Sequence, residues 1–174
     1  ARFSNHHHVR DVLVFDPYGD KGIYTGQAHN DKPHKRGTMR YADGRVYVGE
    51  WYKGRWHGYG RGTFPNGDSY AGQYVYDQRH GKGTYRWHDG RVYNGRFEND
   101  KRHGFGSYSW PDGARYDGEF DDGLYQGKGT FRFADRSFYT GEWQDGMQHG
   151  QGTCSWRNGR VYTGEWYEGK AHGQ

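Results

Sequence analysis

The chain has 174 residues, of which only 31% are hydrophobic, whereas 31 are glycine and 19% are aromatic. This composition excludes an ordinary aliphatic core, but aromatic side chains bury roughly 150–250 Å² each and can replace Leu, Ile and Val. The 25 basic and 21 acidic residues leave a net charge of only +4, and no recognition module is present, so nucleic acid is not expected as a partner. We expect an ordered, thin and elongated protein.

The cysteine content and the absence of targeting signals predict a cytoplasmic location. A single cysteine, Cys154, excludes a disulfide framework and fits a reducing compartment. The sequence contains neither a signal peptide nor an apolar run of about 18 residues, so no membrane span is expected. Because the chain lacks an initiator methionine and ends inside a repeat at Gly173–Gln174, it is expected to be a fragment of a longer array.

The N-terminal segment, residues 1–17, stands apart from the pattern of the remaining chain, residues 18–174. Its apolar run Val12-Leu13-Val14-Phe15 predicts a capping strand, because terminal repeats need a cap. The rest of the segment, including His6-His7-His8, is expected to be irregular. These three histidines could take up a metal ion, but they predict no function.

A strict 23-residue period fills the rest of the chain. Seven tyrosines, at positions 24, 47, 70, 93, 116, 139 and 162, stand 23 residues apart, and each has a glycine two positions on. Six of them have an aromatic residue two positions further, and only the first repeat departs, with Ala28. A period of this length indicates a repeat architecture. It also argues against an enzyme, since an active site is rarely repeated seven times.

Each repeat contains a β-hairpin signal. In residues 83–97, aromatic and polar residues alternate on both sides of Asp89–Gly90, which predicts two strands joined by a tight turn. The related turns Pro65-Asn66-Gly67 and Pro111-Asp112-Gly113 favour a three-residue loop with a glycine bulge. This loop places Tyr85 opposite Tyr93 and puts the aromatic residues on one face. The predicted aromatic core and groove consists of Tyr47, Trp51, Tyr70, Tyr74, Tyr85, Trp87, Tyr93, Phe97, Trp110, Tyr116, Phe120, Tyr139, Trp143, Trp156, Tyr162 and Trp166.

The glycine-rich second half of each repeat returns the chain to the next hairpin, since glycine permits backbone angles that other residues resist. The predicted fold class is therefore all-β. We expect an elongated single-layer antiparallel sheet, a meander of β-hairpins from about seven 23-residue repeats, which forms a rod with a concave aromatic groove.

Short motifs in the repeats resemble those of MORN (membrane occupation and recognition nexus) repeats. They are Tyr-Val-Gly-Glu-Trp at 47–51, Tyr-Thr-Gly-Glu-Trp at 139–143 and 162–166, and His-Gly-Lys-Gly at 80–83, within a resemblance over about residues 18–173. Three local departures, Lys35, Gln126 and Arg136, leave the Lys35 loop and the hairpin at 133–137 less certain than the fold. The resemblance implies a scaffold at cytoskeleton–membrane junctions, and MORN arrays also accompany some lipid kinases and methyltransferases.

No catalytic, cofactor or metal site is predicted. His57, His80, His103, His149 and His172 occupy one repeat position. Equivalent residues in neighbouring repeats should lie about 9–10 Å apart, whereas two ligands of one zinc ion approach within about 4 Å. We therefore interpret these histidines as residues that order loops by hydrogen bonding or stacking.

Function is expected where the repeats differ. The predicted partner contacts are Trp56, Tyr59, Tyr76, Phe105, Leu124 and Tyr125, and Arg79, Lys82 and Arg102 are candidates for lipid headgroups. The C-terminal repeat, with Tyr162, Glu165 and Trp166, is predicted to be an open edge that supports a homodimer. The leading hypothesis is a non-enzymatic, self-associating scaffold that links cytoskeletal or membrane-associated assemblies. The alternatives are a phosphoinositide- or anionic-lipid-binding element, or a regulatory segment of a larger enzyme.

Overall fold

The structure, a computed structural model, describes residues 6–172. Residues 1–5 of the predicted N-terminal segment and residues 173–174 of the predicted repeat array lie outside the described part. The chain divides into two compact units, residues 1–88 and residues 89–174. Each unit is described by itself.

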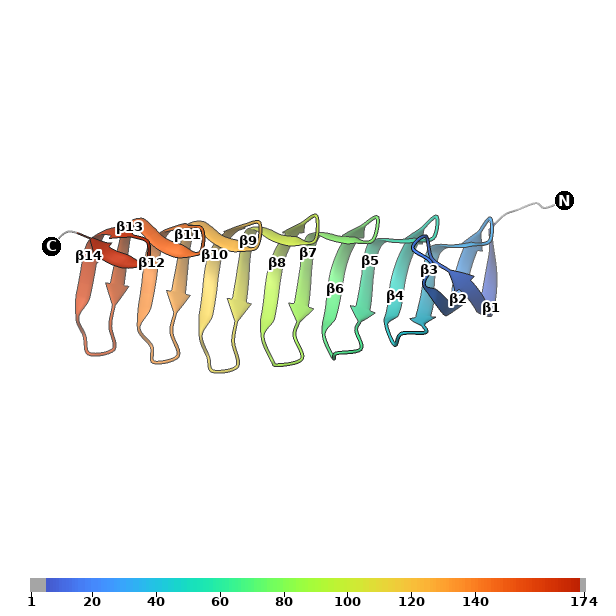
Figure 1. Cartoon of the computed structure of the whole chain (residues 1–174), viewed down its shortest axis with the longest axis horizontal. Coiled ribbons are helices and arrows are strands. Elements are labelled where there is room, and N and C mark those ends of the chain that lie inside the picture. The colour runs from blue at the N-terminus through green and yellow to red at the C-terminus, as the bar shows by residue number, and fades with distance from the viewer. Residues whose placement is uncertain (1–5, 173–174) are drawn as a thin grey trace. The chain divides into compact units, whose positions relative to one another are not determined.

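Both units are antiparallel meanders in which each strand pairs with the next one along the chain (Figure 1). The first unit contains β1 (His6–Phe15), β2 (Lys21–His29), β3 (Lys32–Tyr41), β4 (Val46–Tyr52), β5 (Arg55–Thr63), β6 (Ser69–Val75) and β7 (Gln78–Arg86). The second contains β8 (Val92–Glu98), β9 (Lys101–Ser109), β10 (Arg115–Asp121), β11 (Leu124–Arg132), β12 (Phe138–Gln144), β13 (Met147–Ser155), β14 (Val161–Tyr167) and β15 (Lys170–His172). The predicted all-β, single-layer architecture is confirmed, with two strands in each repeat.

The predicted register of the hairpins is confirmed in both units. In the first unit Met39 pairs with Tyr47 and Gly37 with Gly49. In the second unit, Tyr108 pairs with Tyr116 in the same way. The loop between β9 and β10 has three residues, because the amide of Trp110 bonds to the carbonyl of Ala114 at 2.9 Å. Gly113 supplies the left-handed angle of this loop, with a φ of 98°.

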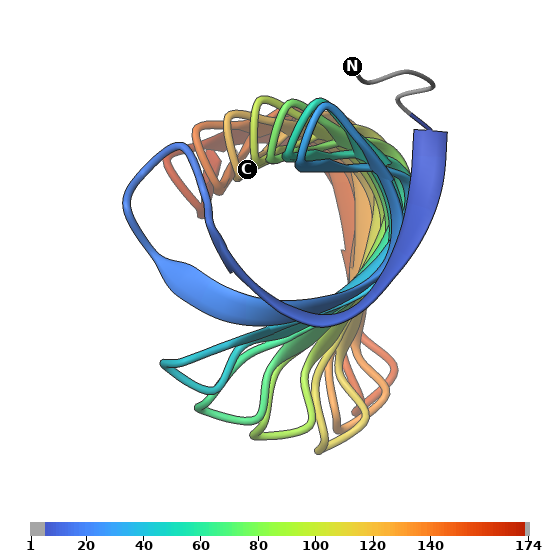
Figure 2. The ribbon, with the colours of Figure 1, turned by 90° about the vertical axis from the view of Figure 1, so that its right-hand side faces the viewer.

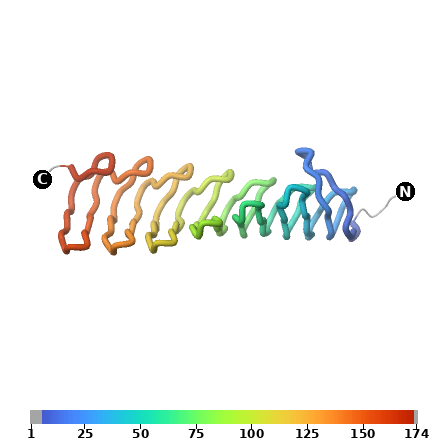
Figure 3. The backbone as a smooth tube through the Cα atoms, turned by 60° about the horizontal axis from the view of Figure 1, so that its bottom comes forward, coloured from blue at the N-terminus to red at the C-terminus, as the bar shows by residue number. Residues whose placement is uncertain are grey.

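The connections between hairpins are themselves two-residue turns. Lys53–Gly54 joins β4 to β5 with φ values of 49° and 85°, and Asp122–Gly123 joins β10 to β11 with 55° and 85°. Two successive positive φ angles identify type I′ turns, whose twist matches that of the flanking strands. Long and short hairpin turns therefore alternate along opposite edges of each meander, as the backbone trace in Figure 3 shows.

The His-Gly-x-Gly motif of residues 57–60 forms a bulge next to the type I′ turn of Lys53–Gly54. Gly49 pairs with Gly60 and Trp51 with Trp56, so one residue of β4 lies opposite His57, Gly58 and Tyr59 of β5. The carboxylate of Glu50 accepts a hydrogen bond from the amide of Tyr59 at 2.6 Å. A Cβ atom on Gly58 would lie 2.1 Å from the same carboxylate. Glycine is thus required at this position because the bulge and its side-chain acceptor occupy the space.

The repeat tyrosines form the buried core. Six of the seven are completely inaccessible to solvent, namely Tyr24, Tyr47, Tyr70, Tyr93, Tyr116 and Tyr139. The hydroxyl of Tyr93 donates a hydrogen bond to the carbonyl of Arg96 at 2.8 Å. The same ring covers Gly106 of the neighbouring strand, where an added Cβ would lie 2.4 Å from the hydroxyl oxygen. The spacing between such a tyrosine and the glycine that it covers therefore follows from packing, because the ring lies flat on the neighbouring strand at a residue without a side chain.

The N-terminal segment is more regular than expected. The predicted capping strand is present, but β1 is ten residues long and includes His6, His7 and His8, which pair with residues of β2. The expectation that these histidines lie in an irregular segment was wrong, since backbone pairing continues past a bulge between Val9 and Val12. A three-residue loop of residues 17–19 joins β1 to β2.

The two substituted glycine positions keep the conformation of glycine. Lys35 replaces the first glycine of His-Gly-x-Gly and has a φ of 68°, and Arg136 replaces a loop glycine and has a φ of 78°. The hairpin loop at Arg136 still closes by the bond from the Phe133 amide to the Ser137 carbonyl, at 2.8 Å. The surrounding pairing thus imposes the left-handed angle on residues that do not favour it.

Candidate interaction surfaces

One repeat position that was predicted to contact a partner belongs to the core. Trp56 is only 8% exposed and stacks on Tyr47 at a centroid distance of 4.5 Å. Its indole nitrogen donates a hydrogen bond to the hydroxyl of Tyr41 at 2.8 Å. In the second unit, Tyr125 stacks on Tyr116 at 4.0 Å. Trp56 and Tyr125 are therefore not free for a partner, because the type I′ turn places each of them opposite a core aromatic residue.

The same position holds Arg102, which lies among aromatic rings. Its guanidinium carbon is 5.9 Å from the ring centre of Tyr93, 5.2 Å from that of Tyr108 and 5.6 Å from that of Phe120. One terminal nitrogen donates a hydrogen bond to the carbonyl of Gly123 at 2.8 Å. The charge of Arg102 is thus held by cation–π contacts and a backbone carbonyl, and its predicted contact with lipid headgroups stays a prediction.

The other two lipid candidates point to opposite faces of the first unit. Arg79 pairs with the core residue Tyr74 in β6, and its guanidinium carbon lies 5.1 Å from the ring centre of Tyr85. Lys82 is exposed and precedes Gly83, the glycine that is covered by the ring of Tyr70. The predicted headgroup set does not form one basic patch.

Four of the predicted partner contacts are exposed. Phe105 is 68% exposed, Tyr59 61%, Tyr76 54% and Leu124 48%. Tyr59 and Phe105 occupy the same repeat position in different units, which elsewhere holds polar residues such as Lys82 and Lys128. These four exposed side chains stay candidates for contact with a partner, because other repeats hold polar residues at the position of Tyr59 and Phe105.

The remaining aromatic residues vary in burial. Trp51, Tyr74, Phe97, Phe120, Trp143 and Trp166 are buried together with the repeat tyrosines, whereas Tyr85, Trp87, Trp110 and Tyr162 are half-buried. Trp156 is 40% exposed. Trp110 occupies the same repeat position as Trp156, and its ring centre lies 5.4 Å from that of Phe131 in the following hairpin. The described residues contain no following hairpin that could cover Trp156 in this way.

The histidines of the repeats order the type I′ turns. The Nδ1 atom of His57 accepts a hydrogen bond from the amide of Tyr76 at 3.1 Å, and the two rings lie 4.7 Å apart. Where Gln126 replaces histidine, its Oε1 atom accepts the same bond from the amide of Asp145 at 3.1 Å. This matches the interpretation of these residues as loop-ordering groups.

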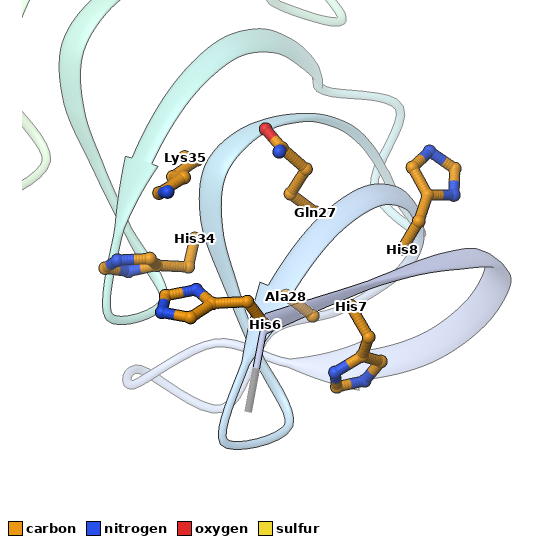
Figure 4. Close-up of a pocket in the computed structure, with 7 residues that line it drawn as sticks. All are labelled: His6, His7, His8, Gln27, Ala28, His34 and Lys35. Carbon is orange, nitrogen blue, oxygen red and sulfur yellow. The ribbon is translucent and has the colours of Figure 1, made fainter. Parts of the chain in front are cut away.

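A cluster of imidazole rings lies at the N-terminal end of the first unit. The ring centre of His29 is 4.3 Å from that of His6 and 5.3 Å from that of His34. In Figure 4 the rings of His6 and His34 are neighbours, whereas His7 and His8 point away from them. Burial and nearby positive charge lower the pKa of His34. No group of three or more possible metal ligands with suitable geometry occurs among residues 6–172.

The C-terminal edge differs from the prediction. Glu165 pairs with His172 and Trp166 with Ala171, so β15 covers this part of β14. The hydroxyl of Tyr162 also donates a hydrogen bond to the carbonyl of His172, at 2.9 Å. Glu165 and Trp166 therefore do not form a free edge. Exposed apolar side chains nevertheless remain on β14, where Val161 is 63% and Tyr167 55% exposed.

The repeat pattern matches a known family. The MORN repeat profile matches residues 24–44, 47–69, 70–90, 93–115, 116–138, 139–159 and 162–174. A search of curated proteins found no match. Among solved structures, the chain is similar to the "SAS-4 (dCPAP) TCP domain in complex with a Proline Rich Motif of Ana2 (dSTIL) of Drosophila Melanogaster", with 11% identity, a TM-score of 0.48, and coverage of 95% of this chain and 96% of that chain. Residues 6–172 contain no helix long and apolar enough to cross a bilayer. Because the repeat profile matches most of its length, this chain belongs to the MORN repeat family.

Proposed function

We propose that this chain is a non-enzymatic scaffold that binds proteins and associates with itself, and that it links cytoskeletal or membrane-associated assemblies in the cytoplasm. One observation carries the proposal. Phe105 and Tyr59 are 68% and 61% exposed at a repeat position where lysine is accepted in other repeats. Because these exposed side chains contribute little to packing within the protein, we infer that they contact the surface of a partner protein.

The C-terminal hairpin is the proposed site of self-association. Val161 and Tyr167 lie on the face of β14 opposite to the buried Trp166, since side chains alternate along a strand. The short strand β15 pairs with only three residues of β14, and no described strand follows it. A second copy related by two-fold symmetry would cover these apolar side chains and continue the sheet.

Sedimentation of the whole chain tests this proposal. We expect a dimer at high micromolar concentration, and a Val161→Arg substitution should return it to a monomer. The matched control is Val48→Arg, because Val48 is a similarly exposed valine, at 50%, in the first unit. A wild-type monomer at high micromolar concentration, or equal effects of the two substitutions, would overturn the self-association.

Lipid binding has less support than protein binding. Of its three candidate residues, only Lys82 presents an exposed side chain, whereas Arg79 and Arg102 lie against aromatic rings. One exposed lysine contributes about 1 kcal/mol near an anionic surface, which is too little for stable attachment. The scaffold role is therefore the function that we propose.

A further inference from the structure

The loop between β1 and β2 is folded onto the type I′ turns of the first unit. The hydroxyl of Tyr18 bonds to Asp77 at 2.9 Å, and Arg55 donates to the same hydroxyl at 2.9 Å. Asp20 forms an ion pair with Arg45 at 3.0 Å. In Figure 2 this loop (dark blue) curls away from the later three-residue loops of the first unit, which are drawn in cyan and green. These contacts hold the loop over part of the sheet instead of beside it.

A cavity of about 330 Å³ lies beneath this loop. Its walls come from the end of β1, from the turn before β3 and from the turn before β5. The lining residues are Val14, Phe15, Asp16, Pro17, Asp31, Lys32, Pro33, Met39, Lys53, Gly54 and Arg55. Residues 14–17 precede the region that the MORN profile matches, so the cavity depends on a feature that the repeats alone do not supply.

The lining of the cavity is apolar in its interior and polar at its rim. Met39 is completely buried and Pro33 is buried beside it. Phe15 is 63% exposed although it lines the cavity. A bound apolar group would cover the exposed ring of Phe15 and would lie close to the buried side chains of Met39 and Pro33.

Positive charge predominates among the groups at the rim that can bind a ligand. Lys32 and Lys53 are exposed, and within residues 6–172 neither of them forms an ion pair. The carboxylate of Asp16 already accepts hydrogen bonds from the amides of Tyr18 and Asp20, at 2.9 and 2.8 Å. The Lys32 and Lys53 ammonium groups can therefore meet an anion, although that of Lys53 also lies 5.2 Å from the ring centre of Tyr52. Lys32, Lys53 and Arg55 outnumber the two carboxylates of the lining, of which Asp16 is engaged by the backbone and Asp31 is exposed.

We propose that this cavity binds a short acidic peptide segment of a partner protein. One apolar side chain of the peptide enters the cavity against Phe15, close to the buried Met39, and the neighbouring carboxylates of the peptide meet Lys32 and Lys53. The volume lies at the small end of the range of about 300–1,000 Å³ for ligand sites, which suits one side chain with its flanking groups. A polyphosphorylated headgroup is less suited, because it has no apolar group to fill the space beside Phe15 and Pro33.

This site extends the proposed scaffold role and is independent of the C-terminal hairpin. The test uses the whole chain labelled with ¹³C in the methionine methyl groups, because the sequence contains only two methionines. Met39 lines the cavity, and Met147 in the second unit is the internal control. The probe is the synthetic peptide acetyl-Asp-Glu-Phe-Glu-Asp-amide. We expect the Met39 methyl resonance to shift in a saturable way and the Met147 resonance to stay in place.

Two control peptides and two variants decide the result. Peptides with lysine in place of the acids, or alanine in place of Phe, should bind at least about fivefold more weakly. Lys53→Glu should weaken the affinity by about fivefold, whereas the matched Lys82→Glu should not. Lys53→Glu is compatible with the fold, because Glu168 occupies the equivalent turn position with the same φ of 49°.

The proposal would be overturned by an unchanged Met39 resonance, by equal effects of the two lysine variants, or by a Met39 shift with phosphatidylinositol-phosphate vesicles but not with the peptide. None of these outcomes affects the sedimentation of the Val161→Arg variant. A failure of the peptide site and a failure of the self-association can therefore be told apart.

Discussion

The hydroxyl of Tyr18 donates a hydrogen bond of 2.9 Å to the Oδ2 atom of Asp77, across 59 residues of sequence. The other oxygen of Asp77 accepts from the amide of Trp56 at 2.8 Å. One carboxylate thus connects the loop after β1, the start of β5 and the turn before β7. The closed position of the β1–β2 loop depends on this residue and on Arg55.

Removal of the Tyr18 hydroxyl should loosen the loop. We expect Tyr18→Phe to lower the free energy of unfolding by about 1 kcal/mol, the usual net value of one hydrogen bond. The amides of residues 16–20 should also exchange faster with solvent. Tyr76→Phe is the control, because it removes the same group from an exposed ring. Equal effects of the two variants in chemical denaturation and hydrogen exchange would show that the contact does not hold the loop.

Glycine at position 35 should stabilise the protein. Lys35 has a φ of 68°, a conformation that costs an L-residue about 1–2 kcal/mol. Glycine loses about 0.5–1 kcal/mol through the flexibility of the unfolded chain. We therefore expect Lys35→Gly to raise the free energy of unfolding by about 0.5–1 kcal/mol. Lys82→Gly, in a strand at a position without a positive φ, should lower it, so urea titrations that gave the same sign for both would contradict this explanation.

A methyl group under a core tyrosine should be severely destabilising. A Cβ on Gly106 would lie 2.4 Å from the hydroxyl oxygen of Tyr93, whereas a Cβ on Gly113 would meet no atom within 4 Å. We expect Gly106→Ala to cost about 3 kcal/mol or more through displacement of the ring. Gly113→Ala should cost only about 1–2 kcal/mol through its positive φ. Thermal unfolding of both variants provides the comparison, and costs of equal size would mean that the ring is not confined by the glycine.

Acidification should weaken the N-terminal end of the first unit. Burial, His29, His6, Lys35 and Lys53 lower the pKa of His34 below its usual 6.5. The unfolded chain therefore binds a proton more readily than the folded chain. The contribution of neutral His34 is complete above pH 6.5 and is lost as the pH falls below this value.

A single substitution isolates this effect. Gln126 fulfils the same role at the equivalent position without a titratable group. His34→Gln should thus preserve the turn and reduce the pH dependence of amide exchange in β2 and β3 between about pH 7.5 and about pH 5.5. If the pH dependence were identical in both proteins, His34 would not be its source.

The repeat pattern predicts the hairpins well because local chemistry determines them. The Asp–Gly turns set a three-residue loop, and the loop sets the pairing of residues such as Tyr108 with Tyr116. The pattern did not reveal the tyrosine–glycine contact as the cause of the spacing, although its signal was present, because six of the seven tyrosines cover a glycine thirteen positions later.

Other features depend on contacts that the pattern does not contain. The sequence predicts Trp56 as a partner contact, but Lys53–Gly54 forms a two-residue turn and places it opposite Trp51 in the core. Asn–Gly is the usual sequence signal of a two-residue type I′ turn, and Lys53–Gly54 adopts the same backbone conformation. The glycine of this pair was therefore a signal from which the turn could have been predicted. The fold-back of the β1–β2 loop could not be predicted, because it depends on a hydrogen bond between residues 59 positions apart.

The repeat position of Trp56, Arg102 and Tyr125 lies beside the core aromatic residues, and Arg102 places a charged side chain there. The Nε atom of Arg102 is buried without a partner among the described residues. Tyr125, one repeat later, stacks on its repeat tyrosine at 4.0 Å. We expect Arg102→Tyr to raise the free energy of unfolding by about 1 kcal/mol, because an aromatic pair replaces a partly unsatisfied guanidinium.

The control for this substitution is Arg96→Tyr, at an exposed position of the same unit, which should change stability little. Chemical denaturation of both variants measures the difference. A loss of stability in Arg102→Tyr would mean that the cation–π contacts with Tyr93, Tyr108 and Phe120 outweigh the buried Nε atom. The charge would then be a structural requirement of that repeat, and the variation at this position would reflect packing and not partner choice.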